Sequence, residues 1–328
     1  MVLIDNQIRT RTESSVQVKF REGLYRLSFT AMATHCEVAY EEPSPERATE
    51  FANAIVNWVI EFESKYSRFL ESSLIGQINA KAGRDSVAID PETETIFRLC
   101  DELHFLTEQT LDPSNLPLTR LWNWKAPEPI IPHRETIQQA GTLVGWNQIV
   151  RQPGSILLPR QGMGIDLGGM GKEYAVDQIT QLAHGMEIAS VLVDFGQDIR
   201  CLGSPPSRPA WHIGLENPKK LGTCDMGIAI DNVAVASSGN YRRFFRKAGR
   251  SYGHIIDSRT GYPVENEVLA ATVISQSCVL SGALSTAAVI LGPAKGIELI
   301  SRTYGAEGII RTREQTVETK EFSNYVVR

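Results

Sequence analysis

The sequence predicts an α+β fold in which helices flank a largely antiparallel sheet. Strand-like and helix-like segments are intermixed along the 328 residues, without the regular strand–helix–strand order of a doubly wound fold. No Pro-, Gly- or Ser-rich linker interrupts the chain, so we expect a single domain over residues 23–328. Residues 1–22 are mostly polar, and we expect them to form a loose N-terminal arm.

The first predicted elements are two strands and two helices. Residues 23–40 alternate between apolar and polar side chains, which predicts two short strands around Met32-Ala33-Thr34. Residues 45–66 carry apolar side chains at the spacing of an amphipathic helix. These side chains are Phe51, Ile55, Val59 and Phe62. A second helix is expected near residues 91–109.

The middle of the chain is expected to be less regular. Residues 111–133 hold five prolines and two tryptophans, which predicts an ordered but irregular loop. A short helix is expected over 135–144, followed by paired strands over 147–150 and 155–158. The segment 163–184 is predicted to run from an apolar strand through Gly168-Gly169 into a helix.

The C-terminal half is expected to supply most of the remaining strands. The strand-like segments are 189–202, 210–216, 226–236, 252–257 and 268–276. A last helix is predicted over 279–291, with terminal strands within 317–327.

Composition excludes several classes of partner. A net charge of −5 does not indicate a nucleic-acid partner. No stretch approaches the roughly 20 apolar residues of a membrane span, and the first 20 residues contain no apolar run of signal-peptide length. As written, the chain is therefore expected to be cytoplasmic.

Its five scattered cysteines lack CxxC spacing and are expected to be reduced thiols. The basic residues between Arg242 and Arg250 predict either a solvated face or a local anion-binding surface.

Residues 164–177 contain the first segment that could carry chemistry. Small residues at 168, 169 and 171 allow close approach of the backbone to a ligand, and the following helix start would seat a pyrophosphate. The alternative is a tight strand-to-helix turn that binds nothing.

Residues 252–263 form the second segment that could carry chemistry. The pattern Asp257-x-x-x-Gly261 predicts a turn capped by Asp257, with Gly261 at positive φ. His254 just before it is either a structural histidine or a general base.

The third segment is Ser281–Ala288. Its hydroxyls, Ser285 and Thr286, could cap a helix or face a metal ion or phosphate.

Taken together, and in this order, the segments resemble the FAD:protein FMN transferases, or ApbE-type family, over residues 30–292. The matching blocks are Met32-Ala33-Thr34; Ser67-Arg68-Phe69 with Ser73-Leu74-Ile75 and Asn79; Leu111-Asp112-Pro113 with Pro117-Leu118 and Leu121-Trp122; 166–177; Gly196-Gln197-Asp198-Ile199; and 254–261. The resemblance implies a T-fold-like core and the transfer of FMN from FAD to a Ser or Thr hydroxyl of an acceptor protein, with release of AMP. It also implies Mg²⁺ as a cofactor. We expect a monomer or weak dimer.

The resemblance also implies roles for particular residues. His254 would be the catalytic base or proton carrier. The FAD contacts would be Met32, Phe69, Thr110, Leu111, Asp112, Gly168, Tyr174 and Ile256, although core packing is an alternative role for Met32, Phe69 and Leu111. The Mg²⁺ ligands that remain would be the backbone carbonyl of Gly171 and the Thr286 hydroxyl.

Two departures from the family pattern concern carboxylates. The family's metal-binding aspartate is replaced by Gly282, and Glu173 stands where the family has glycine. Glu173 is either a substitute ligand or a solvent-facing glutamate in the first turn of the helix. Restoring aspartate at 282 is expected to raise Mg²⁺-dependent activity.

Three functions stay open because of these departures. The first is a flavin transferase with an altered metal site. The second is an FAD-binding protein that performs no transfer, and the third is an FAD pyrophosphatase in which water replaces the acceptor hydroxyl.

Overall fold

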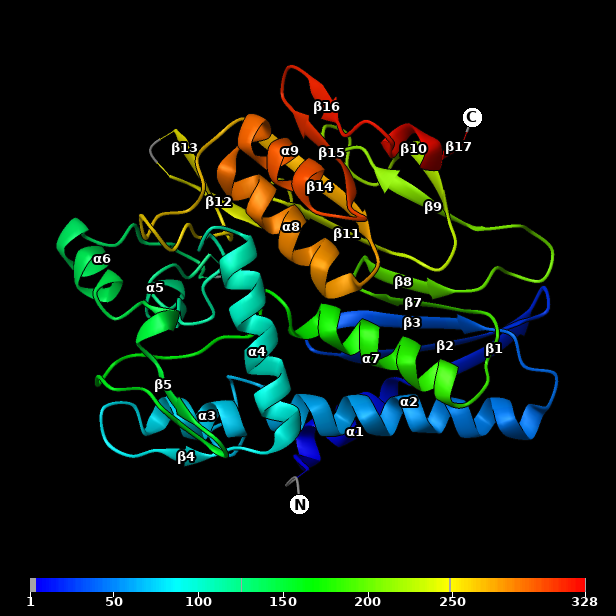
Figure 1. The fold of residues 1–328 in the computed structure, drawn as a ribbon, viewed down its shortest axis with the longest axis horizontal. Helices are drawn as coiled ribbons and strands as arrows, with labels where there is room; N and C mark the ends of the chain where they lie inside the picture. Colours follow the sequence, from blue (N-terminus) through cyan, green and yellow to red (C-terminus); the bar gives the residue numbers. More distant parts are fainter. Residues whose placement is uncertain (1–3, 125, 248, 328) are drawn as a thin grey trace.

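The centre of the protein is a nine-stranded sheet in which each neighbouring pair is antiparallel (Figure 1). The computed structural model describes residues 4–124, 126–247 and 249–327. In spatial order the strands are β1 (Gln17–Arg21), β2 (Leu24–Ala31), β3 (Thr34–Tyr40), β7 (Val191–Phe195), β8 (Asp198–Leu202), β11 (Ala234–Gly239), β14 (Val268–Ser275), β15 (Glu307–Thr312) and β16 (Thr316–Glu318). The predicted α+β class with a large antiparallel sheet is confirmed.

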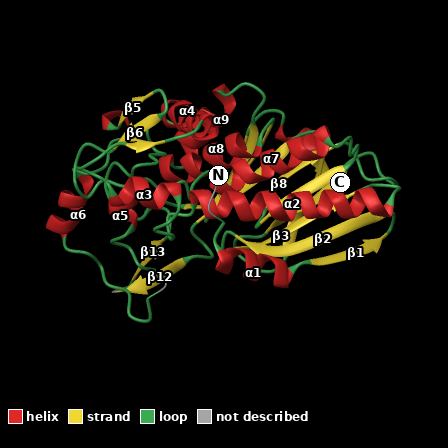
Figure 2. Cartoon of the chain, turned by 90° about the horizontal axis from the view of Figure 1, so that it is seen from below, coloured by secondary structure: helices red, strands yellow, loops and turns green. Residues whose placement is uncertain are grey.

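Helices cover one side of this sheet, as Figure 2 shows for α2, α7 and α8. The helices packed on it are α1 (Asn6–Ser15), α2 (Pro45–Tyr66), α7 (Gly171–Gly185), α8 (Cys278–Leu291) and α9 (Pro293–Arg302). The other face packs, through a second apolar cluster, against a three-stranded sheet. Its strands are β9 (Trp211–Glu216), β10 (Cys224–Ile230) and β17 (Val326–Val327). The middle strands of the central sheet are thus covered on both faces, whereas the edge strand β1 is exposed.

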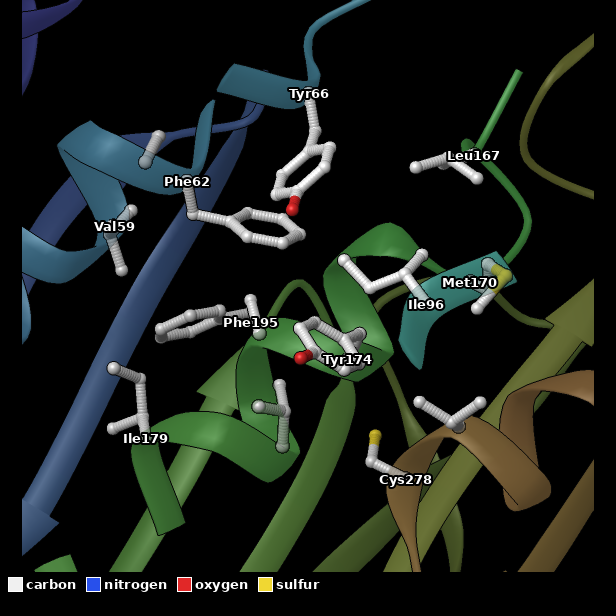
Figure 3. Packing of buried hydrophobic residues seen from close by; sticks show 14 of the residues in the cluster. Val59, Phe62, Tyr66, Ile96, Leu167, Met170, Tyr174, Ile179, Phe195 and Cys278 are labelled. Carbon is white, nitrogen blue, oxygen red and sulfur yellow. The ribbon is translucent and has the colours of Figure 1, made fainter. Parts of the chain in front are cut away.

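The long helix α2 follows the predicted pattern. Pro45 occupies its first turn, and the Ser44 side chain caps it by accepting a hydrogen bond from the amide of Arg47. Each apolar residue of the predicted stripe is buried, namely Phe51, Ile55, Val59 and Phe62. The stripe therefore faces the sheet and α7, which places the end of α2 beside the start of α7 (Figure 3).

The N-terminal segment is ordered, and the expectation of a loose arm is wrong. Residues Asn6–Ser15 form α1, capped by the carboxylate of Asp5, which accepts from the amides of Gln7 and Ile8. Ile8 is buried, and β1 pairs along its whole length with β2. Backbone pairing and a few buried side chains order a segment whose overall polarity predicts none.

The remaining elements surround the central layers. They are α3 (Leu74–Ala80), α4 (Pro91–Leu106), α5 (Leu116–Thr119), α6 (Arg134–Gly141), β4 (Val87–Ala88), β5 (Val150–Gln152), β6 (Ser155–Leu157), β12 (Phe244–Lys247), β13 (Arg250–Gly253), and the 3₁₀ helices at Trp146–Gln148 and Phe322–Tyr325. The predicted helices near 91–109 and 135–144 are present, and the predicted irregular loop contains the short α5. Within the described ranges, no helix is both long and apolar enough to span a bilayer.

Several predicted strands differ from the structure. The segment 189–202 is divided between β7 and β8 by a turn at Gly196 and Gln197, and the segment 147–150 reaches β5 only at Val150, after the 3₁₀ helix at Trp146–Gln148. The segment 226–236 is divided between β10 and β11 by a turn in which Asn232 has a φ of 53°. Residues 163–167 do not form a strand, because the side-chain amide of Asn79 takes the place of a neighbouring strand. Its Nδ2 donates to the carbonyl of Ile165 at 2.9 Å, and its Oδ1 accepts from the Ile165 amide at 2.6 Å.

Candidate functional site

A tight turn leads from the chain at Asp166 into α7. The amide of Gly171 donates to the carbonyl of Leu167 at 2.7 Å, and the amide of Gly168 donates to Asp166 Oδ1 at 2.9 Å. Asp166 in turn pairs with Arg68 at 2.9 Å. Burial raises the pKa of Asp166, and the charge of Arg68 opposes that shift. Through this pair, the glycine turn is linked to the segment that carries Phe69.

Glu173, in the first turn of α7, points inward and lies against Gly282 of α8. Its relative exposure is 7%. A Cβ atom added at Gly282 would lie 2.7 Å from the Cγ of Glu173 and 3.1 Å from its Oε1. The alternative of a solvent-facing glutamate is therefore wrong. The carboxyl group of Glu173 occupies the space beside position 282, where the family pattern has an aspartate.

One end of the Glu173 carboxyl group lies near a cation. The Lys172 ammonium forms an ion pair with Asp198 and lies 3.9 Å from Glu173 Oε1. The other oxygen, Oε2, is buried and has no hydrogen-bond partner among the described residues. Burial raises the pKa of Glu173 to about 7, with the Lys172 charge lowering it and the nearby Asp198 charge raising it.

The hydroxyl groups of Ser285 and Thr286 lie in the middle of α8, so the alternative that they cap the helix is wrong. Ser277 is the cap, since its side chain accepts from the amide of Leu280. Ser238 on β11 hydrogen-bonds both hydroxyls, with its Oγ 2.9 Å from that of Ser285 and 2.8 Å from Oγ1 of Thr286. Gly282 and Thr286 are four residues apart, and so they lie on the same face of α8.

Asp177 ties α7 to α8, and the sequence pattern alone did not reveal this role. Its carboxylate accepts from the amides of Cys278 at 2.8 Å and Val279 at 3.0 Å, at the start of α8. The same carboxylate pairs with Arg200 of β8 at 2.7 Å. One turn separates Asp177 from Glu173, so this anchor sets how Glu173 meets Gly282.

His254 follows β13 and is held by its backbone, whose amide donates to the carbonyl of Arg243 at 3.0 Å. Burial, together with the charges of Arg243 and Lys172, lowers the pKa of His254 to about 4. The imidazole is consequently neutral at neutral pH and able to accept a proton. Its Nδ1 is buried and has no hydrogen-bond partner in the part of the chain that the structure describes.

The turn predicted after His254 is present. The amide of Gly261 donates to the carbonyl of Asp257 at 2.8 Å, and Gly261 has a φ of 76°. The Asp257 carboxylate accepts from the amide of Arg259 at 2.9 Å and pairs with its guanidinium at 2.8 Å. Trp122 Nε1 donates to the carbonyl of Gly261 at 2.8 Å. This hydrogen bond joins the turn to the irregular segment 111–133, which lies far earlier in the sequence.

Two of the predicted flavin contacts, Tyr174 and Met32, pack into the main apolar cluster. Tyr174 is buried, and its ring stacks on that of Phe62 with centroids 5.7 Å apart (Figure 3). Met32 lies in the turn between β2 and β3, with a φ of 49°, and its amide donates to Glu63 at 2.8 Å. Both residues take part in the apolar cluster under α2 and α7. Packing in the apolar cluster therefore accounts for the positions of the Tyr174 and Met32 side chains.

Phe69 differs from these two because its side chain is 78% exposed. The Arg68 guanidinium lies 4.3 Å from the centre of its ring. Core packing does not explain an aromatic ring in this position, so that alternative is wrong for Phe69. Gly168, at the linked glycine turn, is also exposed.

The remaining predicted contacts lie in two segments that meet. Thr110 is buried, and its carbonyl accepts from the Ser258 hydroxyl at 3.4 Å, two residues beyond the buried Ile256. Leu111 is half-buried. The Asp112 carboxylate accepts from the amide of Ser114 at 2.7 Å and from that of Trp146 at 3.3 Å, so it shapes the local turn.

The predicted metal site has few protein ligands. Among the residues that the structure describes, no three His, Cys, Asp or Glu side chains are grouped so that they could hold an ion. The buried, unpartnered Glu173 Oε2 is nevertheless the kind of oxygen that Mg²⁺ accepts, and one carboxylate is enough where substrate phosphates supply further ligands. The donor set therefore fits a cation held jointly with a phosphate-bearing substrate.

Comparison with known proteins decides the family. The model of the ApbE family matches residues 32–310, which include every candidate site residue. The chain belongs to the ApbE family.

Relatives of this ApbE-family chain have consistent names. The FAD:protein FMN transferase of Vibrio cholerae is 26% identical over 275 residues, which cover 83% of this chain and 82% of that protein. The protein of the same name in Haemophilus influenzae is 25% identical over 314 residues, covering 91% and 90%. The crystal structure of the ApbE protein from Thermotoga maritima has a TM-score of 0.85 at 26% identity, covering 93% of this chain and 100% of that one.

Proposed function

We propose that this ApbE-family chain transfers FMN from FAD to a Ser or Thr hydroxyl of an acceptor protein and releases AMP. The observation that carries the proposal is the meeting of the α7 start with α8. The exposed glycine turn leads into α7, whose first turn carries the buried Glu173 carboxyl group, and the neighbouring α8 carries the Thr286 hydroxyl. The amides at the start of a helix favour a pyrophosphate, which is the group that this reaction must bind.

The exposed Phe69 ring provides a surface for the flavin. An isoalloxazine is a flat aromatic system, and an exposed ring gains stacking energy when such a ligand covers it. Phe69 is joined to the glycine turn through Arg68 and Asp166, so one ligand with a flavin and a pyrophosphate could contact both.

The chemical step forms one phosphoester bond and breaks another. The acceptor oxygen attacks the phosphorus of the FMN half of FAD, and the bond from that phosphorus to the AMP oxygen breaks, so that AMP leaves with the electron pair. The hydroxyl proton passes to the neutral imidazole of His254. A bound Mg²⁺, held by Glu173 and Thr286 near Gly171, would supply charge neutralisation at the pyrophosphate.

The test incubates the protein with FAD, Mg²⁺ and a folded acceptor domain that carries a Ser or Thr target. Covalent flavin fluorescence of the acceptor in a denaturing gel and AMP release are followed together. The proposal expects both signals in equal amounts. AMP release without acceptor fluorescence would instead identify an FAD pyrophosphatase. Tight FAD binding with neither signal would identify a flavin-binding protein.

A further inference from the structure

The strongest unexplained feature of the molecule is the inward-facing carboxyl group of Glu173. An ionisable side chain that is 7% exposed normally has a partner for each oxygen, because burial of an unpaired carboxylate is costly. Oε1 has only the Lys172 ammonium, at 3.9 Å, and that ammonium is already paired with Asp198. Oε2 has no hydrogen-bond partner among the described residues.

Gly282 is the reason that the side chain of Glu173 fits in this place. A Cβ at 282 would come within 2.7 Å of Glu173 Cγ, so glycine leaves room for the glutamate on this face of α8, and a larger residue would force Glu173 to move. Thr286 lies one turn further along the same face, with its hydroxyl 2.8 Å from Ser238 Oγ. Each of the two packed helices therefore carries one oxygen donor, Glu173 in the first turn of α7 and Thr286 one turn beyond the contact between Gly282 and Glu173.

We propose that Glu173 is a ligand of a divalent cation, and that it acts from α7 in the position that an acidic residue at 282 would serve from α8. Oxygen ligands from one carboxylate, one hydroxyl and a bound pyrophosphate suit Mg²⁺ or Mn²⁺. Lys172 remains paired with Asp198 and keeps that second carboxylate occupied. The inference deepens the proposed function and relies on it only for the phosphate ligands.

The experiment measures Mn²⁺ binding directly, by electron paramagnetic resonance of free Mn²⁺, with and without ADP as a stable pyrophosphate probe. The full chain is compared with Glu173→Gln, Glu173→Gly, Gly282→Asp and the double exchange Glu173→Gly with Gly282→Asp. Glu102→Gln, at an exposed position of α4, is the matched control. Thermal unfolding establishes that each variant is folded.

We expect Glu173→Gln and Glu173→Gly to weaken Mn²⁺ binding at least about tenfold, while Glu102→Gln leaves it unchanged. The double exchange should restore binding, because it moves the carboxylate to the other helix without crowding. Equal Mn²⁺ affinity of the wild-type protein and Glu173→Gln would overturn the proposal, as would absence of Mn²⁺ binding to the wild-type protein with ADP. Thr286→Val provides an independent check, and unchanged binding in that variant would remove Thr286 from the ligand set and contradict the site as stated.

Failure of this proposal is distinguishable from failure of the proposed function. If the protein transfers flavin and its Mn²⁺ binding does not depend on Glu173, the proposed function is supported and Glu173 is not a metal ligand. If Mn²⁺ binding depends on Glu173 but neither flavin transfer nor AMP release occurs, the metal site is supported and the proposed function is wrong.

Discussion

Glu173 on α7 and Gly282 on α8 share room for only one side chain, since a Cβ at 282 would lie 2.7 Å from the Cγ of Glu173. This relation changes the expectation for Gly282→Asp. In the wild-type background, that substitution would force two carboxyl groups together in a buried place, with both steric and electrostatic cost. A gain in activity is expected only when Glu173 is shortened at the same time.

The crowding can be measured without any ligand. Gly282→Ala should lower the free energy of unfolding by about 1–3 kcal/mol, and the loss should be much smaller in a Glu173→Gly background. Urea unfolding of the four proteins gives the coupling energy. Gly185→Ala is the control, because a Cβ there meets nothing within 4 Å and is expected to be neutral or slightly stabilising. An equal loss in both backgrounds would mean that the two side chains do not compete.

His254 should make stability depend on pH in a defined window. Its folded-state pKa of about 4 lies below the ordinary value of 6.5, so the unfolded chain takes up the proton first as the pH falls. Relative to His254→Gln, the wild-type protein should lose about 3 kcal/mol of unfolding free energy as the pH falls through the range from 6.5 to 4, and the loss should level off below pH 4. Unfolding at a series of pH values measures the difference. An NMR titration midpoint for His254 above 6.5 would contradict it.

The same residue has a separate expected effect on catalysis. His254→Gln should lower the rate of flavin transfer by about 10²–10⁴-fold, the usual range for loss of a general base, while the Kd for FAD stays close to the wild-type value. Single-turnover flavinylation and a fluorescence titration with FAD measure the two quantities. If the rate is retained, the proton goes elsewhere and His254 has a structural role.

Asp177 should be important for stability because three groups depend on it. Asp177→Ala removes the acceptor for two amides of α8 and the partner of Arg200, and should lower the free energy of unfolding by about 2–4 kcal/mol. Gln181→Ala, at an exposed position of the same helix, should change it by less than about 0.5 kcal/mol. Similar melting temperatures for the two variants would show that α8 does not depend on this cap.

The exposed ring of Phe69 can be tested against a second exposed phenylalanine. Phe69→Ala should raise the Kd for FAD about 5–10-fold, the equivalent of one aromatic stacking contact, and leave stability nearly unchanged. Phe105→Ala, whose side chain is 87% exposed on α4, should change neither quantity. Flavin fluorescence quenching gives both constants. An unaltered Kd for Phe69→Ala would exclude this ring from the flavin site.

Hydrophobic periodicity predicted the elements in which apolar residues recur at the helix or strand spacing. The stripe of α2 and the alternation of β2 and β3 succeed because every turn or every second residue is apolar. The helix α1 was missed because it buries few residues, Ile8 among them, and depends on its cap and on β2. The strand expected over 163–167 failed because Asn79, a distant side chain, replaced its backbone partner.

In the candidate site, too, local motifs were predictable from the sequence and contacts between distant segments were not. The turn at Asp257 and Gly261 is a local motif, and its geometry followed from its residues. The inward position of Glu173 did not, because a first-turn glutamate is polar by itself and only the glycine on a second helix makes room for it. The role of Asp177 is likewise invisible without the position of the α8 start. Relations between two helices are properties of packing, which a single sequence does not display.

The pairing of β3 with β7 sets the order in which this molecule can fold. Cys36 lies opposite Phe195 in that pair, and residues 41–190 connect the two strands. The β2–β3 hairpin is local and can form early, whereas its junction with β7 must await closure of a very long loop and is expected to be a late, slow step. Because α7 packs on β7 and β8, the candidate site assembles only after that junction. During synthesis, the edge of β3 that will receive β7 therefore stays unpaired, and it is the part of the growing chain most open to pairing with other molecules.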